Sequence, residues 1–246
     1  MSDGTQQYDR IGSTYDEYSR TSTCKRAERY SFLRMVGDLQ GQRVLDLACG
    51  LGFYTRLIKQ HGARQVIGVD ISPEMIRLAK QQEQAEPLGI TYQVCDVTEL
   101  PRLGPVDLIT AIHLLNYARS KEEMLKMFQQ AYDNLELGGR LVAYTVNPAF
   151  KLSGSNFAKY GVQVTSEAPE DDHHVLQGVF VVNPSAPVTV YRWSASTYEA
   201  ALKEAGFREF AWHPAEVSPE DLKEYGNEYW QEFYDNCVNI GLVCKK

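Results

Sequence analysis

The stretch RVLDLACGLG, residues 43–52, decides the fold. Its first half is a short apolar run that predicts a strand, and a helical pattern over residues 53–61 follows directly after Gly52. A turn with small side chains between a strand and a helix lets a ligand approach the backbone at the helix N-terminus. A tight connection with only a packing role is the alternative interpretation of this turn taken alone.

Strand and helix patterns alternate on both sides of this turn. Residues 8–36 carry aromatic and apolar residues at helical spacing, with Gly37 as the expected stop, and helices are expected over residues 73–84 and 121–135. Alternation of this kind predicts parallel βαβ units with right-handed crossovers, and so an α/β protein with a doubly wound, seven-stranded, mostly parallel sheet. The remaining strands of the first half are expected in QVIGVD (65–70), ITYQVCD (90–96), VDLITAIH (106–113) and RLVAYTV (140–146).

The helical rhythm stops between Asn147 and Trp193. Two β-rich runs, GVFVV (178–182) and VTVYRW (188–193), flank NPSAP and predict a hairpin inserted as a small cap. The sheet pattern then returns, with a helix over residues 196–205, a strand over 207–212, a helix over 220–234 and a last strand at IGLVC (240–244).

The composition excludes several classes of function. The 246 residues have a formal net charge of -7 without a basic cluster, which argues against a nucleic-acid or membrane partner. The N-terminus lacks a signal-peptide profile and no apolar run approaches the ~20 residues of a membrane span, so the cytoplasm is the expected compartment. The five cysteines form no metal-ligand spacing, and we expect free thiols and no metal.

Acidic residues end the second and third predicted strands. Asp70 lies at about the distance beyond the glycine turn at which an acidic residue meets a ribose in dinucleotide folds. It also precedes Ser72-Pro73, a good N-cap and first helical position. Asp96 is placed to accept a hydrogen bond from an adenine amino group, with a solvated loop carboxylate as the alternative.

Five motifs in order, DLACGLG, GVDISPEM, CDV, DLITAIHLLNY and LELGGRLV, resemble those of the class I S-adenosylmethionine-dependent methyltransferases over about residues 42–146. The resemblance implies S-adenosyl-L-methionine as cofactor and S-adenosyl-L-homocysteine as product. It places the methionine part on the turn, the ribose on Asp70 and the adenine near Ile71, Met75, Asp96 and Val97. The residues expected to bind the cofactor are Tyr15, Tyr18, Asp46, Ala48, Cys49, Gly50, Gly52, Asp70, Ile71, Met75, Asp96, Val97 and Ala111.

One position departs from the family pattern. The first small residue of the usual D-x-G-x-G-x-G turn is Ala48, which is tolerated unless that position needs a positive φ. An NAD-dependent dehydrogenase is the rival with the same fold, but its G-x-G-x-x-G turn is not present here.

The resemblance gives one methyltransferase domain over residues 1–246. Its parts are an N-terminal helical lid (1–40), a cofactor-binding core (41–147), a β-rich cap (148–194) and the C-terminal part of the sheet (195–246). Tyr8, Tyr15 and Tyr18 are expected in the lid, closing over the methionine end of the cofactor, with ordinary core aromatics of an amphipathic helix as the alternative.

Methyl transfer is an in-line displacement, so alignment and exclusion of water are the main tasks of the protein. His113, just after the fourth strand, is the candidate general base, although a packing role is equally open to it. His173 and His174, in EDDHH, are expected in a solvated loop. Residues expected to contact the acceptor are His113, Asn116, Tyr117, Asn147, Tyr191 and Trp193, the last two with packing of the cap as the alternative.

The run from YDRIGSTYDEY through the fifth strand is similar to toxoflavin-type azapteridine N-methyltransferases. That similarity implies a nitrogen of a small planar heterocycle as the methyl acceptor. An oxygen acceptor is also open. The alternatives are a catalytically weak protein that binds the cofactor and a protein methyltransferase; the expected assembly is a monomer or a homodimer.

Overall fold

The computed structural model describes residues 17–154 and 157–246. Its main sheet has the strand order β3-β2-β1-β4-β5-β10-β9, with β1 to β5 parallel and β10 antiparallel to both of its neighbours. The predicted doubly wound, mostly parallel sheet is confirmed. The strands are β1 (Arg43–Leu47), β2 (Gln65–Asp70), β3 (Thr91–Val94), β4 (Val106–Ile112), β5 (Leu135–Val146), β9 (Glu209–His213) and β10 (Asn239–Lys245).

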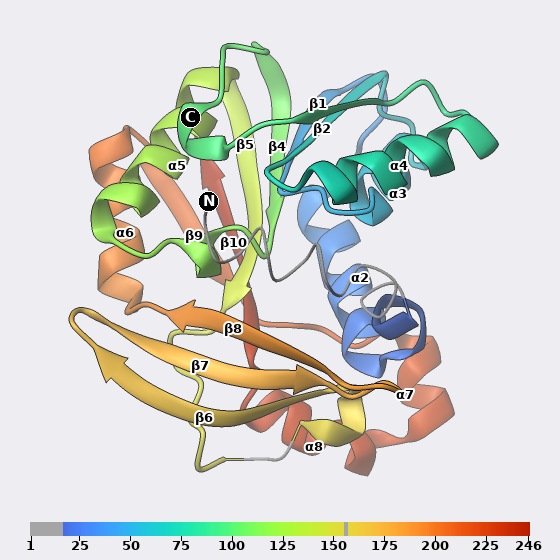
Figure 1. Cartoon of the computed structure of the whole chain (residues 1–246), viewed down its shortest axis with the longest axis vertical. Helices are drawn as coiled ribbons and strands as arrows, with labels where there is room; N and C mark the ends of the chain where they lie inside the picture. Colours follow the sequence, from blue (N-terminus) through green and yellow to red (C-terminus); the bar gives the residue numbers. More distant parts are fainter. Residues whose placement is uncertain (1–16, 155–156) are drawn as a thin grey trace.

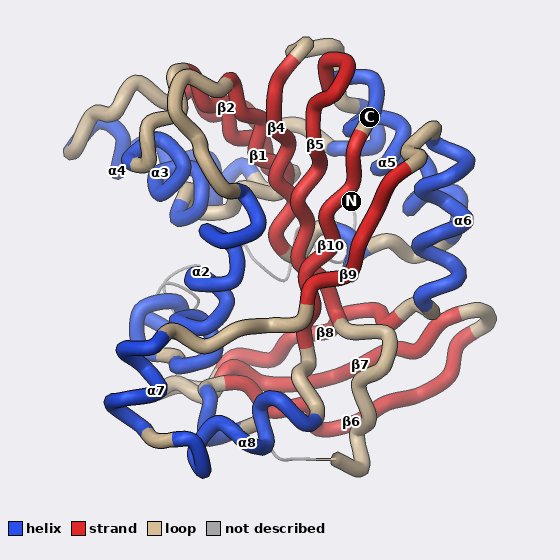
Figure 2. The backbone as a smooth tube through the Cα atoms, turned by 180° about the vertical axis from the view of Figure 1, so that it is seen from behind, coloured by secondary structure: helices blue, strands red, loops and turns tan. Residues whose placement is uncertain are grey.

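Helices cover both faces of this sheet, and Figure 2 shows α2, α3 and α4 on one side and α5 and α6 on the other. Neighbouring β5 residues pack into different cores, with Val142 and Tyr144 on the α2 side and Leu141 and Ala143 on the α5 side. The helices are α2 (Thr23–Val36), α3 (Phe53–Gln60), α4 (Pro73–Ala85), α5 (Lys121–Asn134), α6 (Ala195–Ala205), α7 (Pro219–Tyr225) and α8 (Asn227–Asp235), with short 3₁₀ turns η1 (Val97–Glu99), η2 (Leu115–Tyr117) and η3 (Ala158–Tyr160).

Local sequence signals explain where the helices begin and end. The hydroxyl of Ser72 accepts a hydrogen bond from the Met75 amide, and Pro73 occupies the first turn of α4, as the sequence predicts. Gly37 caps α2 with a φ of 66°, which confirms the expected stop.

The inserted cap is a three-stranded antiparallel sheet rather than the predicted hairpin. It consists of β6 (Val162–Glu170), β7 (His173–Phe180) and β8 (Ala186–Arg192). β6 was not predicted, because its residues are largely exposed and polar and show no apolar run. Figure 1 shows this sheet beneath the carboxyl end of β5, so the cap faces the edge where ligands of open α/β sheets bind.

The predicted loop at His173 and His174 is wrong. The tight turn is made by Asp171, whose φ is 44°, and Asp172, and β7 begins at His173. His173 is buried and its ring packs 4.5 Å from the ring of Trp193. Aspartate tolerates the left-handed backbone that closes this hairpin. The acidic residues 170–172 had favoured a solvated loop because of their charge.

The C-terminal part differs from the prediction at one point. The helix expected over residues 220–234 is split into α7 and α8 by Gly226, whose φ is 81°. The last strand, β10, inserts between β5 and β9. Among the described residues, no helix combines the length and apolar character needed to cross a membrane.

Candidate active site

The turn after β1 is built from left-handed backbone. Ala48, Gly50 and Gly52 have φ values of 55°, 54° and 85°. A Cβ added at Gly50 meets no atom within 4 Å, so the turn is open on that side. Gly52 is closed instead, because a Cβ there would come within 2.3 Å of the Tyr92 hydroxyl oxygen. The turn therefore presents backbone to an open space at the start of α3.

Ala48 has a positive φ, the one condition under which an alanine was not expected to be tolerated at this position. A left-handed backbone costs an L-residue roughly 1–2 kcal/mol, which glycine avoids. The structure thus shows a departure from the family pattern that carries an energetic cost at the centre of the site.

We expect Ala48→Gly to raise the free energy of unfolding by about 1 kcal/mol, because relief of the left-handed strain exceeds the added chain entropy of glycine. Denaturant unfolding measures the change. Ala200→Gly, at an exposed position inside α6, is the matched control and should lower stability by about 1 kcal/mol. Equal losses in both variants would contradict the assignment of strain to Ala48.

Asp46 lies beneath the turn and is buried. Its carboxylate accepts hydrogen bonds from the hydroxyls of Thr55 (2.6 Å) and Thr110 (2.7 Å). Burial raises the pKa of this carboxyl to about 6, against the effect of the two hydroxyls. Asp46 thus ties β1 to α3 and β4, and supports the turn from below.

Asp70 ends β2 beside the same turn. One carboxylate oxygen accepts the Gly50 amide at 2.8 Å and the other accepts the Ser72 amide at 2.9 Å. Asp70 therefore joins the turn after β1 to the start of α4 through one carboxylate. The prediction that it binds a ribose is compatible with this place.

The residues expected around an adenine lie at the next strand ends. Val97 and Met75 are buried, and Ile71 is an exposed apolar side chain. Asp96 accepts hydrogen bonds from the amide and the hydroxyl of Thr98, both at 2.8 Å, and so caps η1. Cys49 is a buried free thiol in the turn, and Ala111 is buried within β4.

His113 follows β4 with an unusual backbone. Its φ is 61°, and its amide donates to the Tyr144 carbonyl at 2.8 Å, which holds it against β5. Residues in sparsely populated conformations gather at functional sites, where the surrounding structure imposes them. The geometry turns the His113 side chain into the space between the sheet edge and the cap.

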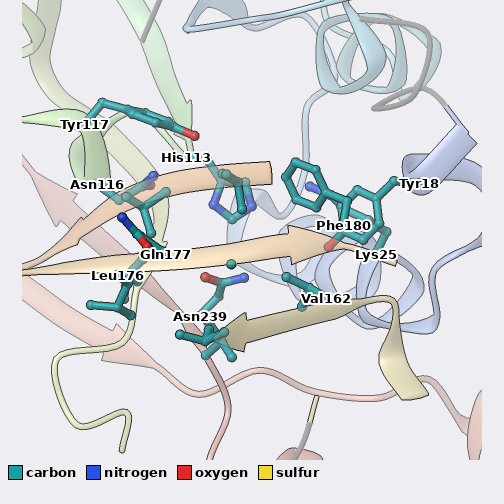
Figure 3. Close-up of a pocket in the computed structure, with 16 residues that line it drawn as sticks. Tyr18, Lys25, His113, Asn116, Tyr117, Val162, Leu176, Gln177, Phe180 and Asn239 are labelled. Carbon is teal, nitrogen blue, oxygen red and sulfur yellow. The ribbon is translucent and has the colours of Figure 1, made fainter. Parts of the chain in front are cut away.

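A cavity fills that space (Figure 3). Tyr18 and Phe180 lie at one end, their rings stacked with centroids 4.4 Å apart, and Asn116 and Tyr117 lie at the other, with His113 between them. The polar side chains of its wall are Lys25, His113, Asn116, Gln177 and Asn239, and its apolar side chains come from the cap, β5 and the segment before β10. The cavity joins the N-terminal helices, the core and the cap.

A buried hydrogen-bond network behind His113 was not predicted from the sequence. Glu28, on α2, is 1% exposed and accepts hydrogen bonds from Lys25 Nζ (2.5 Å), Tyr54 Oη (2.5 Å) and His113 Nε2 (2.8 Å). Helical spacing predicted α2, but only the fold brings Glu28 beside a histidine 85 positions later in the chain.

The structure brings some predicted acceptor contacts together and separates others. His113, Asn116 and Tyr117 line the cavity. Tyr18, expected at the methionine end of the cofactor, also lines it, while Tyr8 and Tyr15 lie outside the described residues. The described lining does not include Asn147, Tyr191 or Trp193.

Packing explains the places of these three residues. The side-chain amide of Asn147 donates to the Cys237 carbonyl at 3.0 Å, and the Trp193 indole donates to the Ala118 carbonyl at 2.9 Å. The Tyr191 ring packs 4.9 Å from that of His173. Tyr191 and Trp193 therefore pack within the protein, as the alternative interpretation expected. The structure does not support their predicted contact with the acceptor. Among the described residues, no three His, Cys, Asp or Glu side chains come together in a way that could hold a metal ion.

Comparison with known proteins shows which families the sequence resembles. Residues 44–139 match the family model described as a methyltransferase domain. A ubiquinone biosynthesis O-methyltransferase of Coxiella burnetii is 32% identical over 124 residues, which cover 50% of this chain and 51% of that protein. A magnesium-protoporphyrin O-methyltransferase of Rhodobacter capsulatus is 38% identical over 90 residues, covering 36% of this chain and 39% of that protein. The chain thus spans about half the length, or less, of these relatives.

Solved structures extend the likeness to almost the whole chain. The crystal structure of an S-adenosylmethionine-dependent methyltransferase from Clostridium acetobutylicum has a TM-score of 0.66 and 20% sequence identity, covering 97% of this chain and 98% of that one. At this identity the likeness shows a common fold.

Proposed function

We propose that the protein is a class I S-adenosylmethionine-dependent methyltransferase that methylates a nitrogen or oxygen of a small, flat acceptor bound in the cavity. The match of residues 44–139 to a methyltransferase domain supports this proposal. The single observation that carries the proposal is the position of His113. It follows β4 directly, at the carboxyl edge of the parallel strands where the turn after β1 also lies, on the wall of a largely apolar cavity.

The residues around the turn fit the cofactor. The open side of Gly50 leaves room against the backbone, Asp70 offers a carboxylate beside it, and Val97 and Met75 supply apolar walls. When bound, S-adenosylmethionine supplies a methyl group on a positively charged sulfur. The protein's part is to orient the acceptor, to keep water out and to accept a proton.

The cavity favours a small aromatic acceptor over a protein side chain. Its walls come from three separate parts of the chain, with Tyr18 and Phe180 stacked across one end. Such an arrangement encloses a flat molecule, whereas a peptide substrate needs an extended groove. The N-terminal segment thus contributes Tyr18 to the wall of this cavity.

Carboxamide groups in the wall favour a heterocycle. Asn116 is 1% exposed, and among the described residues its side-chain oxygen has no hydrogen-bond partner. A buried acceptor without a donor is costly, so a ligand with an N–H or O–H group gains by facing it. Together with Gln177 and Asn239, it offers the donors and acceptors that the edge of a nitrogen heterocycle requires.

The sequence relatives support methyl transfer, and their names point to oxygen as the methylated atom in those proteins. The similarity to toxoflavin-type enzymes and the carboxamides of the cavity favour nitrogen in this one. We therefore propose a planar heterocycle with an acidic N–H group as the preferred acceptor.

A panel of acceptors with radiolabelled cofactor tests this proposal. Bicyclic N–H heterocycles, catechols and a peptide library are compared at equal concentration, and label in the product is counted. We expect the highest kcat/KM for a heterocycle. Preferred turnover of catechols would overturn the nitrogen assignment, and preferred turnover of peptides would overturn the small-molecule assignment. S-adenosylhomocysteine binding without turnover of any panel member would favour a cofactor-binding protein.

A further inference from the structure

Glu28 is the most fully enclosed charged group beside the cavity. It lies outside the matched methyltransferase domain, on a helix with no cofactor motif. Its two carboxylate oxygens are used separately, with Lys25 and Tyr54 donating to Oε1 and His113 Nε2 lying 2.8 Å from Oε2. Only His113 and Lys25 of this network reach the cavity wall.

Glu28 is ionised in this setting. Burial alone would raise its pKa, but the charges of Lys25 and His113 and their hydrogen bonds outweigh burial and hold the pKa well below its usual range. An ionised carboxylate only accepts hydrogen bonds. The His113 Nε2 atom beside it must therefore carry a hydrogen.

We propose that Glu28 is a positioning residue that holds His113 as the Nε2–H tautomer and so leaves Nδ1 as the general base for the acceptor. This inference rests on the proposed methyl transfer. In a neutral imidazole only one ring nitrogen carries the proton, so fixing it on Nε2 frees Nδ1. The backbone of His113, held by its amide bond to Tyr144, sets the ring's place in the wall.

The acceptor N–H or O–H gives its proton to Nδ1, and its electron pair forms the new bond to the methyl carbon. The carbon–sulfur bond breaks, and its electron pair stays on sulfur. His113 then holds an imidazolium, which later releases its proton to solvent.

The charges around the ring suit this step. In the neutral form of His113 that the reaction requires, Lys25 balances the charge of Glu28. After transfer, the imidazolium lies 2.8 Å from the carboxylate, which stabilises the new charge away from water. Tyr54 contributes a second neutral donor to the carboxylate and adds no charge. The network thus stabilises the charge that the base carries after proton transfer.

Long-range ¹H–¹⁵N spectra of histidine-labelled protein test the tautomer directly. The chain has five histidines, and the His113 signals are those lost in His113→Gln. We expect Nε2–H at His113 in the wild-type protein and loss of this fixed tautomer in Glu28→Gln, because the amide presents a donor as well as an acceptor. A wild-type His113 with its proton on Nδ1 would overturn the inference.

Kinetics of the same variant supply the second readout. We expect Glu28→Gln to lower kcat by about 10²-fold or more, with KM for the acceptor and the Kd of S-adenosylhomocysteine within about threefold. Asp221→Asn is the matched control: it alters another buried carboxylate that pairs with α2, through Arg26, yet lies away from His113, and should keep kcat. Equal falls of kcat in both variants would overturn the positioning role.

The two readouts separate this inference from the proposed function. The tautomer is measured without any acceptor, so the wild-type spectrum decides it even where Glu28→Gln fails to fold. If every acceptor fails while the Nε2–H tautomer is observed, the proposed reaction falls and the positioning of His113 stands. If methyl transfer occurs with the Nδ1–H tautomer, the positioning role falls and the proposed reaction stands.

Discussion

A His113→Gln variant should bind S-adenosylhomocysteine normally but lose kcat by about 10²–10⁴-fold, the range that a positioned general base contributes. Glutamine has no group that accepts a proton at neutral pH, yet its amide reaches toward Glu28 and can replace the donor at Nε2. Methyl transfer to the best acceptor of the panel measures the effect on kcat.

His61→Gln is the control for this substitution, because His61 is exposed at the end of α3 and its ring makes a hydrogen-bond contact with the Leu57 carbonyl. It should keep the wild-type kcat. A His113→Gln enzyme with kcat within about threefold of wild type would show that the acceptor needs no base, and that alignment alone carries the reaction.

Replacing Asp70 with alanine should weaken S-adenosylhomocysteine binding by about 100-fold. A hydrogen bond to a charged group contributes roughly 1.5–3 kcal/mol, and two ribose hydroxyls are expected on this carboxylate. A loss of about 3 kcal/mol corresponds to a hundredfold rise in Kd. The substitution also leaves the amides of Gly50 and Ser72 without their acceptor, which loosens the turn itself. Calorimetric titration measures the change.

Asp107→Ala is the matched control. Asp107 pairs with Arg43 at the opposite, amino-terminal edge of the parallel strands, so its loss should lower stability and leave the Kd unchanged. Tight binding to Asp70→Ala would contradict the placement of the ribose, and equal weakening in both variants would assign the effect to general loss of structure.

The sequence predicted those parts of the molecule that depend on local chemistry. The strand, turn and helix around residues 43–60, the cap at Ser72 and the stop at Gly37 follow from residue types at fixed spacing. The place of Asp70 beside the turn follows from the same reasoning, because parallel strands end at one edge of the sheet.

Features that depend on contacts between residues far apart in the chain could not be predicted from the sequence. β6 is polar because one of its faces is open to solvent, and its pairing with β7 is visible only in the fold. His173 became a core residue because Trp193 and Tyr191 pack on it, although its acidic neighbours suggested solvent. Glu28 had no motif at all, since its importance arises from contact with His113 across the chain.

The place of β10 in the sheet has a consequence for how the chain folds during synthesis. β10 pairs Asn239 with Val146 and Lys245 with Arg140, and it alone joins β9 to the rest of the sheet. Until β10 has left the ribosome, the edge of β5 stays unpaired and β9 has no neighbouring strand. Pairings between such distant segments close late, because the entropy of the long loop must be overcome first. The nascent protein therefore exposes an open sheet edge from the completion of β5 until β10 emerges, the state in which a chaperone is of greatest use.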